Sequence, residues 1–276
     1  MLKSLRCGGR LARVGVHLVW GWSLATALYP FLAQPSRRGL QRRWSRDLLD
    51  MLGLRLEISG PAAPARDDDG AIQGLLVANH VSWLDVFVIS SLAPATFVCK
   101  SEVRHWPLIG SLCANTGTVF LERGSKFAAQ RTHQALAEKL RQGEQVALFP
   151  EGTTGEGRAL MPFRAALLQS AIDAGSPVQP LAIRYLNGRG DRAEAANYCG
   201  ETSFWQSLCS IAAAPALVAS ISILEPLATL SASRKDLAEK THAAIRKSLE
   251  RQASRPRHLD RDEQRSDDEQ LVLIGQ

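Results

Sequence analysis

The sequence predicts an α/β fold with a largely parallel central sheet flanked by helices, preceded by a separate helical region at the N-terminus. Two observations predict it. Short apolar runs alternate with helical stretches over most of the chain, which favours parallel strands covered on both faces. The chain of 276 residues, 45% of them hydrophobic, is also long enough to bury a substantial core. These figures exclude a wholly disordered or collagen-like chain.

The first distinct segment is an uncharged run over residues 14–34, which follows four basic residues. As a helix it would reach about 31 Å, roughly the thickness of a bilayer core. Polar residues and Pro30 dilute its hydrophobicity, and its Trp and Tyr side chains suit the headgroup boundary. The Ala-x-Ala at 25–27 mimics a signal-peptide cleavage site, but the apolar stretch continues to Leu32 and then meets Arg37. We therefore predict a retained membrane anchor that either spans the bilayer or lies in its interface.

The next segment, residues 38–52, is an amphipathic helix. Its apolar stripe comprises Leu40, Trp44, Leu48 and Met51 or Leu52, and its opposite side carries Arg38, Arg42 and Arg46. Such a helix can lie on anionic lipid, where each basic residue contributes about 1 kcal/mol. It can also pack its stripe on the domain core. The two interpretations are compatible, and both stay open.

Strands and helices are then expected in alternation. The expected strands are at 54–58, 74–78, 96–99, 117–121, 145–149, 178–185 and 217–224, and the expected helices at 82–91, 125–142, 164–174 and 233–250. Residues 207–224 are apolar enough to resemble a second membrane span. Because Pro215 interrupts them, a core helix followed by a strand is the favoured interpretation.

Charge and cysteine content narrow the classes of partner. The formal net charge is +6, which favours an anionic partner without identifying it. The basic residues gather beside the apolar N-terminal segment and no aromatic-basic recognition motif occurs, so lipid is favoured over nucleic acid. The five cysteines are scattered, with no zinc-ligand spacing, so we expect free thiols and no metal site.

Chemistry-bearing residues lie at the ends of predicted strands, where ligands bind α/β sheets. Asn79 and His80 follow the strand at 74–78, and Asp85 falls in the first turn of the next helix. In one interpretation, Ser82 and Asp85 form a helix capping box and His80 is structural. In the other, Asp85 holds one ring nitrogen of His80 protonated and leaves the other free to accept a proton.

Three further segments are individually weak signals. Residues 117–124 form a strand that delivers Arg123 at its end, where a guanidinium can pair on the surface or bind phosphate. Residues 148–157 follow another strand, and three glycines there let backbone amides approach a ligand. Residues 178–182 form an apolar strand with a proline near its start.

Together, these segments carry a specific pattern. The order Asn-His-x-x-x-x-Asp, Gly-x-x-Phe-x-x-Arg, Phe-Pro-Glu-Gly-Thr and an apolar strand with proline resembles the glycerolipid acyltransferase family, in particular bacterial 1-acylglycerol-3-phosphate acyltransferases. The resemblance runs from about residue 75 to residue 182 and includes the segment 97–102 between the first two motifs.

The resemblance implies transfer of a fatty acyl chain from acyl-CoA or acyl carrier protein to a lysolipid hydroxyl. His80 would be the general base and Asp85 would orient it. No covalent enzyme intermediate is expected, and the sequence has no Gly-x-Ser-x-Gly nucleophile motif. The positions that the resemblance assigns to substrate binding are Lys100, Arg123, Glu151, Gly152 and Thr153. No cofactor is implied beyond the acyl donor.

One departure concerns the acceptor. Many members of the family carry Arg after Phe-Pro-Glu-Gly-Thr, whereas this chain has Thr154. 1-Acylglycerol-3-phosphate, giving phosphatidic acid, remains the first expectation. Another lysolipid, such as lyso-ornithine lipid, is the alternative, and a non-enzymatic membrane lipid-binding protein is the second.

The resemblance and the composition together give the expected organisation of the chain. Membrane-binding helices would occupy residues 1–53, the catalytic domain 54–252, and a charged disordered tail 253–276. We expect the protein at the inner (cytoplasmic) membrane, with the catalytic domain facing the cytoplasm. Its expected partners are membrane lipids, the lysolipid and the acyl donor, and not nucleic acid.

Overall fold

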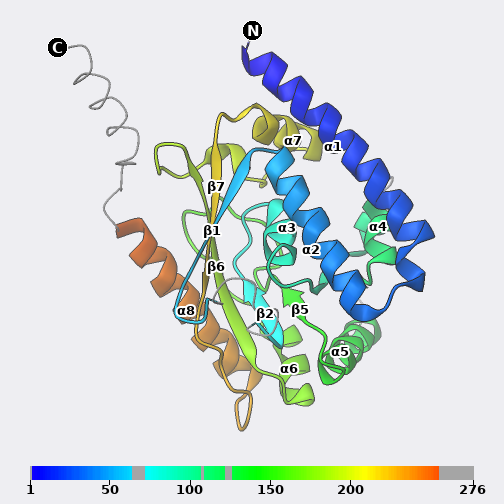
Figure 1. The fold of residues 1–276 in the computed structure, drawn as a ribbon. Helices are drawn as coiled ribbons and strands as arrows, with labels where there is room; N and C mark the ends of the chain where they lie inside the picture. Colours follow the sequence, from blue (N-terminus) through cyan, green and yellow to red (C-terminus); the bar gives the residue numbers. More distant parts are fainter. Residues whose placement is uncertain (1, 64–71, 107–108, 122–125, 255–276) are drawn as a thin grey trace, which may run out of the picture.

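The computed structural model describes residues 2–63, 72–106, 109–121 and 126–254. These residues contain a seven-stranded sheet in the order β1-β7-β6-β2-β5-β3-β4 (Figure 1). The strands are β1 (Leu54–Ser59), β2 (Leu75–Ala78), β3 (Thr96–Lys100), β4 (Val119–Leu121), β5 (Val146–Leu148), β6 (Val178–Asn187) and β7 (Leu217–Ile223). All neighbours are parallel except β6 and β7. The predicted fold class is confirmed.

Helices cover both faces of this sheet, as Figure 1 shows. The helices are α1 (Leu2–Ala27), α2 (Gln34–Met51), α3 (Leu84–Ser90), α4 (Ile109–Asn115), α5 (Lys126–Arg141), α6 (Gln169–Ala174), α7 (Phe204–Ala213) and α8 (Arg234–Ser254). Short 3-10 turns add η1 (Tyr29–Phe31), η2 (Ser101–His105), η3 (Ala166–Leu168) and η4 (Glu194–Ala196). The α2, α3 and α7 helices lie on one face, and α5, α6 and α8 on the other.

Strand β2 explains this layering. Successive side chains of a strand point to opposite faces. Leu76 and Ala78 pack in the core beneath α2, α3 and α7, whereas Leu75 and Val77 pack in the core formed with α5, α6 and α8. All four are fully buried, which is why this strand reads as an unbroken apolar run in the sequence.

Helix α1 is seated against the domain along one side. Val14 and Ala25 are buried, and His17 stacks on Trp44 of α2 with ring centroids 4.7 Å apart. Arg6 donates to the carbonyl oxygen of Ala213, at the end of α7. The other side of the segment from α1 to η1 exposes large apolar side chains, among them Val16, Val19, Trp20, Leu28 and Phe31. Among the described helices, none combines the length and the apolarity needed to cross a bilayer.

Helix α2 packs its apolar stripe on the core. Leu48 and Leu52 are buried there. Two of its arginines bind backbone carbonyls of the domain: Arg38 donates to Gly143, and Arg46 donates to Ser91. The structure therefore supports the core-packing interpretation of this segment.

Other predictions differ from the structure in detail. The helix expected at 164–174 is a 3-10 turn followed by the short α6, and η2 and α4 were not predicted. Residues 207–224 form the end of α7 followed by β7, so the core interpretation of that apolar stretch is confirmed. Helix α8 continues to Ser254, and the rest of the predicted tail lies outside the described residues.

Candidate active site

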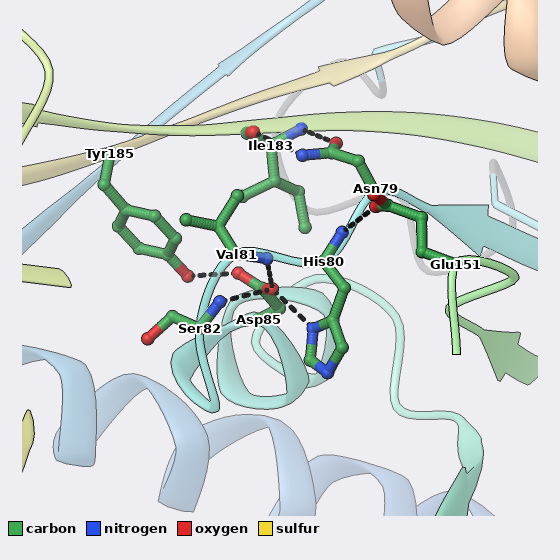
Figure 2. Close-up of polar contacts among 8 residues, drawn as sticks. All are labelled: Asn79, His80, Val81, Ser82, Asp85, Glu151, Ile183 and Tyr185. Atoms are coloured by element: carbon green, nitrogen blue, oxygen red, sulfur yellow. Dashed lines mark hydrogen bonds and ion pairs between the residues drawn. The ribbon is translucent and has the colours of Figure 1, made fainter. Parts of the chain in front are cut away.

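The centre of the site is the carboxylate of Asp85, which has no exposed surface. Its Oδ2 accepts hydrogen bonds from the backbone N–H groups of Val81 and Ser82, at 2.8 and 3.0 Å. The same oxygen lies 2.8 Å from Nδ1 of His80. Its Oδ1 accepts a hydrogen bond of 2.6 Å from the hydroxyl of Tyr185 (Figure 2). Four donors from β6 and the β2–α3 loop thus satisfy one buried charge.

These contacts fix the protonation pattern of His80. Because the Asp85 carboxylate can only accept, Nδ1 of His80 carries the proton and Nε2 is left with a free lone pair. The imidazole stacks on Phe149, with ring centroids 3.9 Å apart and an interplanar angle of 10°. Of its side-chain surface, 19% is exposed. The predicted pairing of His80 with Asp85 is present, in a geometry that suits a general base.

The predicted capping box forms only in part. The Asp85 carboxylate accepts from the N–H of Ser82, as in such a box. The return bond is missing: helix α3 begins at Leu84, and the Asp85 N–H donates to the carbonyl of Ser82 rather than to its hydroxyl. The buried Ser82 hydroxyl has no partner among the described residues. Asp85 therefore accepts hydrogen bonds from His80 and the loop before α3 and does not form a complete capping box at the start of α3.

Two side chains hold the loop that carries His80. The Asn79 amide donates to the carbonyl of Ile183 and accepts from its N–H, which extends the β2–β6 pairing by one side chain. The buried Glu151 carboxylate accepts from the N–H of His80 at 2.7 Å and from the N–H of Met161 at 3.0 Å. His80 is thus fixed by β6 on one side and by the loop after β5 on the other.

Burial changes the acidity of two groups around His80. It raises the pKa of Glu151, although the two backbone hydrogen bonds act in the opposite direction. The pKa of Tyr185 lies well above its ordinary value, first because of burial and then because of the nearby Asp85 charge. Tyr185 therefore remains a neutral hydrogen-bond donor at physiological pH.

An apolar cavity of about 320 Å³ lies beside His80. It extends from His80 towards α1 and α2, past Phe97, Leu18 and Trp44. Thr154, the residue at the departure from the family pattern, also lines it. A cavity of this kind suits a hydrocarbon chain, because burying apolar surface contributes roughly 25 cal/mol per Å².

The other predicted site residues differ in position and in exposure. Gly152 adopts a left-handed backbone (φ 73°), and the guanidinium of Arg164 lies 3.3 Å from where a Cβ would stand. Thr153 and Lys100 are exposed. Arg123 lies outside the described residues. No cluster of His, Cys, Asp or Glu suited to a metal ion occurs in the described part of the chain.

Sequence reasoning missed the role of Tyr185. It lies at the end of the predicted strand 178–185, 100 residues from Asp85 along the chain. A tyrosine that ends an otherwise apolar buried strand needs a partner for its hydroxyl, and that was the available signal. The stacking of Phe149 on His80 was also not predicted, although the residue belongs to a motif.

Comparisons with known proteins identify the family of the chain. A family model described as Acyltransferase matches residues 62–184. The chain is 36% identical over 251 residues to the lyso-ornithine lipid O-acyltransferase of Pseudomonas aeruginosa, covering 90% of this chain and 93% of that protein. It is 41% identical over 153 residues to the 1-acyl-sn-glycerol-3-phosphate acyltransferase of Neisseria meningitidis serogroup B, covering 55% of this chain and 58% of that protein. The alignment thus spans little more than half of the Neisseria protein.

A solved structure has the same fold. It is the crystal structure of the 1-acyl-sn-glycerophosphate acyltransferase of Thermotoga maritima, with a TM-score of 0.60 and 20% sequence identity. The match covers 90% of this chain and 99% of that one. At this identity, the likeness concerns the fold alone.

The raised pKa of Glu151 predicts a pH-dependent stability difference between the wild type and Glu151→Gln. A carboxyl with a raised pKa binds its proton more tightly in the folded state, so its ionisation disfavours folding. As pH rises from the ordinary value of 4.5, the unfolding free energy of the wild type should therefore fall relative to that of the variant. The difference should level off above the raised value. Urea denaturation at a series of pH values measures it.

Glu201→Gln, which removes an exposed carboxyl, is the matched control for the change in net charge. A wild type that gains stability relative to Glu151→Gln as pH rises would contradict the assigned cause, since a carboxylate stabilised by its two hydrogen bonds behaves in that way.

Proposed function

The chain belongs to the glycerolipid acyltransferase family, and from this premise we propose that it transfers a fatty acyl chain from an acyl thioester to the hydroxyl of a lysolipid, with His80 as the general base. The observation that carries the proposal is the free Nε2 of His80 beside an apolar cavity. Since the chain is an acyltransferase, the alternative of a non-enzymatic lipid-binding protein is set aside.

The proposed reaction needs few groups. Nε2 of His80 takes the proton of the lysolipid hydroxyl while the oxygen attacks the thioester carbonyl. The tetrahedral intermediate collapses to the new ester, the carbon–sulfur bond breaks, and the protonated imidazole returns the proton to the leaving thiolate. Asp85 stabilises the imidazolium and holds its orientation, and Tyr185 positions Asp85. The acyl chain lies in the apolar cavity.

The cysteines beside the cavity fit direct attack by the lysolipid. Cys99 and Cys113 line the cavity. Burial raises the pKa of Cys99 to about 12 and also raises the pKa of Cys113. Both thiols are therefore protonated at physiological pH and are poor nucleophiles.

Removal of the base tests the mechanism. His80→Ala should lower kcat by about 10²–10⁴-fold, the usual contribution of a general base. Asp85→Asn should also lower kcat, because the amide cannot accept from all four donors. His105→Ala, which removes an exposed histidine outside the cavity lining, is the matched control. Unchanged acyl transfer by folded His80→Ala, with folding checked by circular dichroism, would overturn the assignment.

For the acceptor, we propose 1-acylglycerol-3-phosphate first. The motif position at Gly152 has the Arg164 guanidinium beside it, a cation that can pair with phosphate. The Neisseria relative carries that activity in its name. Lyso-ornithine lipid is the second candidate, because Thr154 puts a neutral side chain in the cavity wall and the Pseudomonas relative, aligned over nearly its full length, is named for that acceptor.

A direct comparison of acceptors decides between the two. The purified enzyme should give the larger kcat/KM with 1-acylglycerol-3-phosphate. Thr154→Arg should raise that value about tenfold or more and leave the value for lyso-ornithine lipid unraised, because a new charge-assisted hydrogen bond contributes about 1.5–3 kcal/mol. Thr202→Arg adds the same charge at an exposed position as the control. A larger wild-type kcat/KM with lyso-ornithine lipid would make the second candidate correct.

We also propose that the exposed apolar surface of α1 and η1 binds the inner membrane, with the catalytic domain facing the cytoplasm. Phe31 is 84% exposed and Trp20 is 60% exposed, which is unfavourable in water but suits a membrane interface. The opposite side of α1, including Leu18 and Leu24, lines the cavity beside His80. A lipid substrate can therefore pass from the bilayer to His80 along one helix.

Charged substitutions on this surface test the membrane proposal. The double variant Trp20→Asp/Phe31→Asp should bind vesicles of mixed neutral and anionic phospholipid at least about tenfold more weakly, because burial of two large apolar side chains is lost. Leu230→Asp, at a residue that is 90% exposed before α8, is the matched control. Vesicle sedimentation measures both. Equal binding by the wild type and the double variant would place the membrane contact elsewhere.

A further inference from the structure

A second cavity, of about 360 Å³, is lined by residues of β6 and α8. His80 borders both this cavity and the apolar one. The second cavity differs in its chemistry, because charged side chains line it. They are the four arginines Arg158, Arg184, Arg192 and Arg246 and the three glutamates Glu151, Glu156 and Glu250. The proposed reaction, as described above, leaves this cavity without a role.

Arg184 is the distinctive member of this set. It alternates in β6 with Ile183 and Tyr185, which pack on the opposite face, so its side chain points towards α8. It is half-buried, and burial lowers its pKa. Among the described residues, no carboxylate lies within ion-pair distance of it. A guanidinium that is partly removed from water and has no counter-ion favours the binding of an anion.

The other arginines are partly satisfied within the protein. Arg158 pairs with Glu156 at 3.1 Å, and Arg246 lies 3.9 Å from Glu250. Arg192 donates to the carbonyl oxygen of Glu156 and lies 3.4 Å from the Glu194 carboxylate. Carboxylates thus pair with these three arginines. The Arg184 guanidinium, with five N–H bonds to donate, has no such partner among the described residues.

The two substrates differ in where they can place an anion. In a phosphorylated lysolipid, the phosphate is only a few bonds from the reacting hydroxyl, so it stays close to His80. In the acyl donor, the long pantetheine arm separates the thioester sulfur from its phosphate. The donor can therefore hold its thioester at His80 while its phosphate lies farther away, on the other side of the loop of residues 79–81.

Resting on the proposed function, we propose that the arginine-lined cavity binds the phosphate of the phosphopantetheine arm of the acyl donor, with Arg184 as its principal ligand. The acyl chain then occupies the apolar cavity on one face of the sheet, and the arm crosses beside His80 to the other face. Acyl-CoA and acyl carrier protein share this arm, so the proposal holds for both donors.

Truncated donors separate binding of the phosphate from every other effect. Arg184→Gln should raise KM for acyl-CoA about tenfold or more, the loss expected for a charge-assisted hydrogen bond, and leave KM for the lysolipid unchanged. With an acyl thioester of N-acetylcysteamine, which has no phosphate, Arg184→Gln and the wild type should have equal kcat/KM. Equality with that donor also shows that the variant is folded. Arg189→Gln, on the exposed turn after β6, is the matched control.

Three outcomes would overturn the proposal: an unchanged KM for acyl-CoA in Arg184→Gln, a raised KM for the lysolipid instead, or an equal loss with the truncated donor. A loss with acyl-CoA and acyl carrier protein alike supports the shared phosphate as the bound group. The loss is expected with each of the two donors that the wild type uses, because both carry this phosphate.

Failure of the proposed function has a different signature, namely a wild type inactive with every donor and acceptor. In that case, calorimetric titration with CoA tests the cavity directly. Weaker binding of CoA by Arg184→Gln than by the wild type supports the proposal, and equal binding or none overturns it.

Discussion

The Asp85 carboxylate has no exposed surface, so its negative charge has to be met by donors inside the protein. Those donors come from the loop after β2 and from Tyr185 on β6, which means that the sheet must pair β2 with β6 before the charge is satisfied. The same carboxylate decides which nitrogen of His80 carries the proton. The pairing of β2 with β6, the burial of the Asp85 charge and the free Nε2 of His80 therefore depend on one another.

The loop that meets this constraint also separates two environments. On one face of the sheet it borders an apolar cavity that reaches α1, and on the other a cavity lined by arginines. Asn79 extends the β2–β6 pairing through its side chain, and Glu151 binds the backbone of His80 from the opposite side. This bracing keeps the loop as a wall between the cavities, with His80 at the point where both can be reached.

The amino-acid sequence predicted those features that depend on residues close together in the chain. Strands such as β2 are buried on both faces and read as unbroken apolar runs, and the His80–Asp85 spacing places two groups within reach across a few residues. It did not predict the roles of side chains whose contacts come from residues far away in the sequence. Tyr185 and Arg184 are neighbours in one predicted strand, and only the register of β6 against β2 sends one to Asp85 and the other to the opposite face. The sequence likewise left open whether α2 packs on lipid or on the core, because that depends on which elements lie beside it in the fold.

The proposed reaction brings groups of opposite solubility, a hydrocarbon chain and a phosphate, to one proton acceptor. A pocket on a single face would have to be apolar for the hydrocarbon and basic for the phosphate, and desolvating arginines beside a hydrocarbon is costly. The end of a sheet avoids that conflict, because alternate residues of one strand point to different faces. In β6, Tyr185 donates a hydrogen bond to the buried Asp85 carboxylate, while the adjacent residue in the chain, Arg184, lines the cavity beside α8. Because neighbouring residues of a strand point to opposite faces, β6 contributes to the apolar side through one residue and to the polar side through the next.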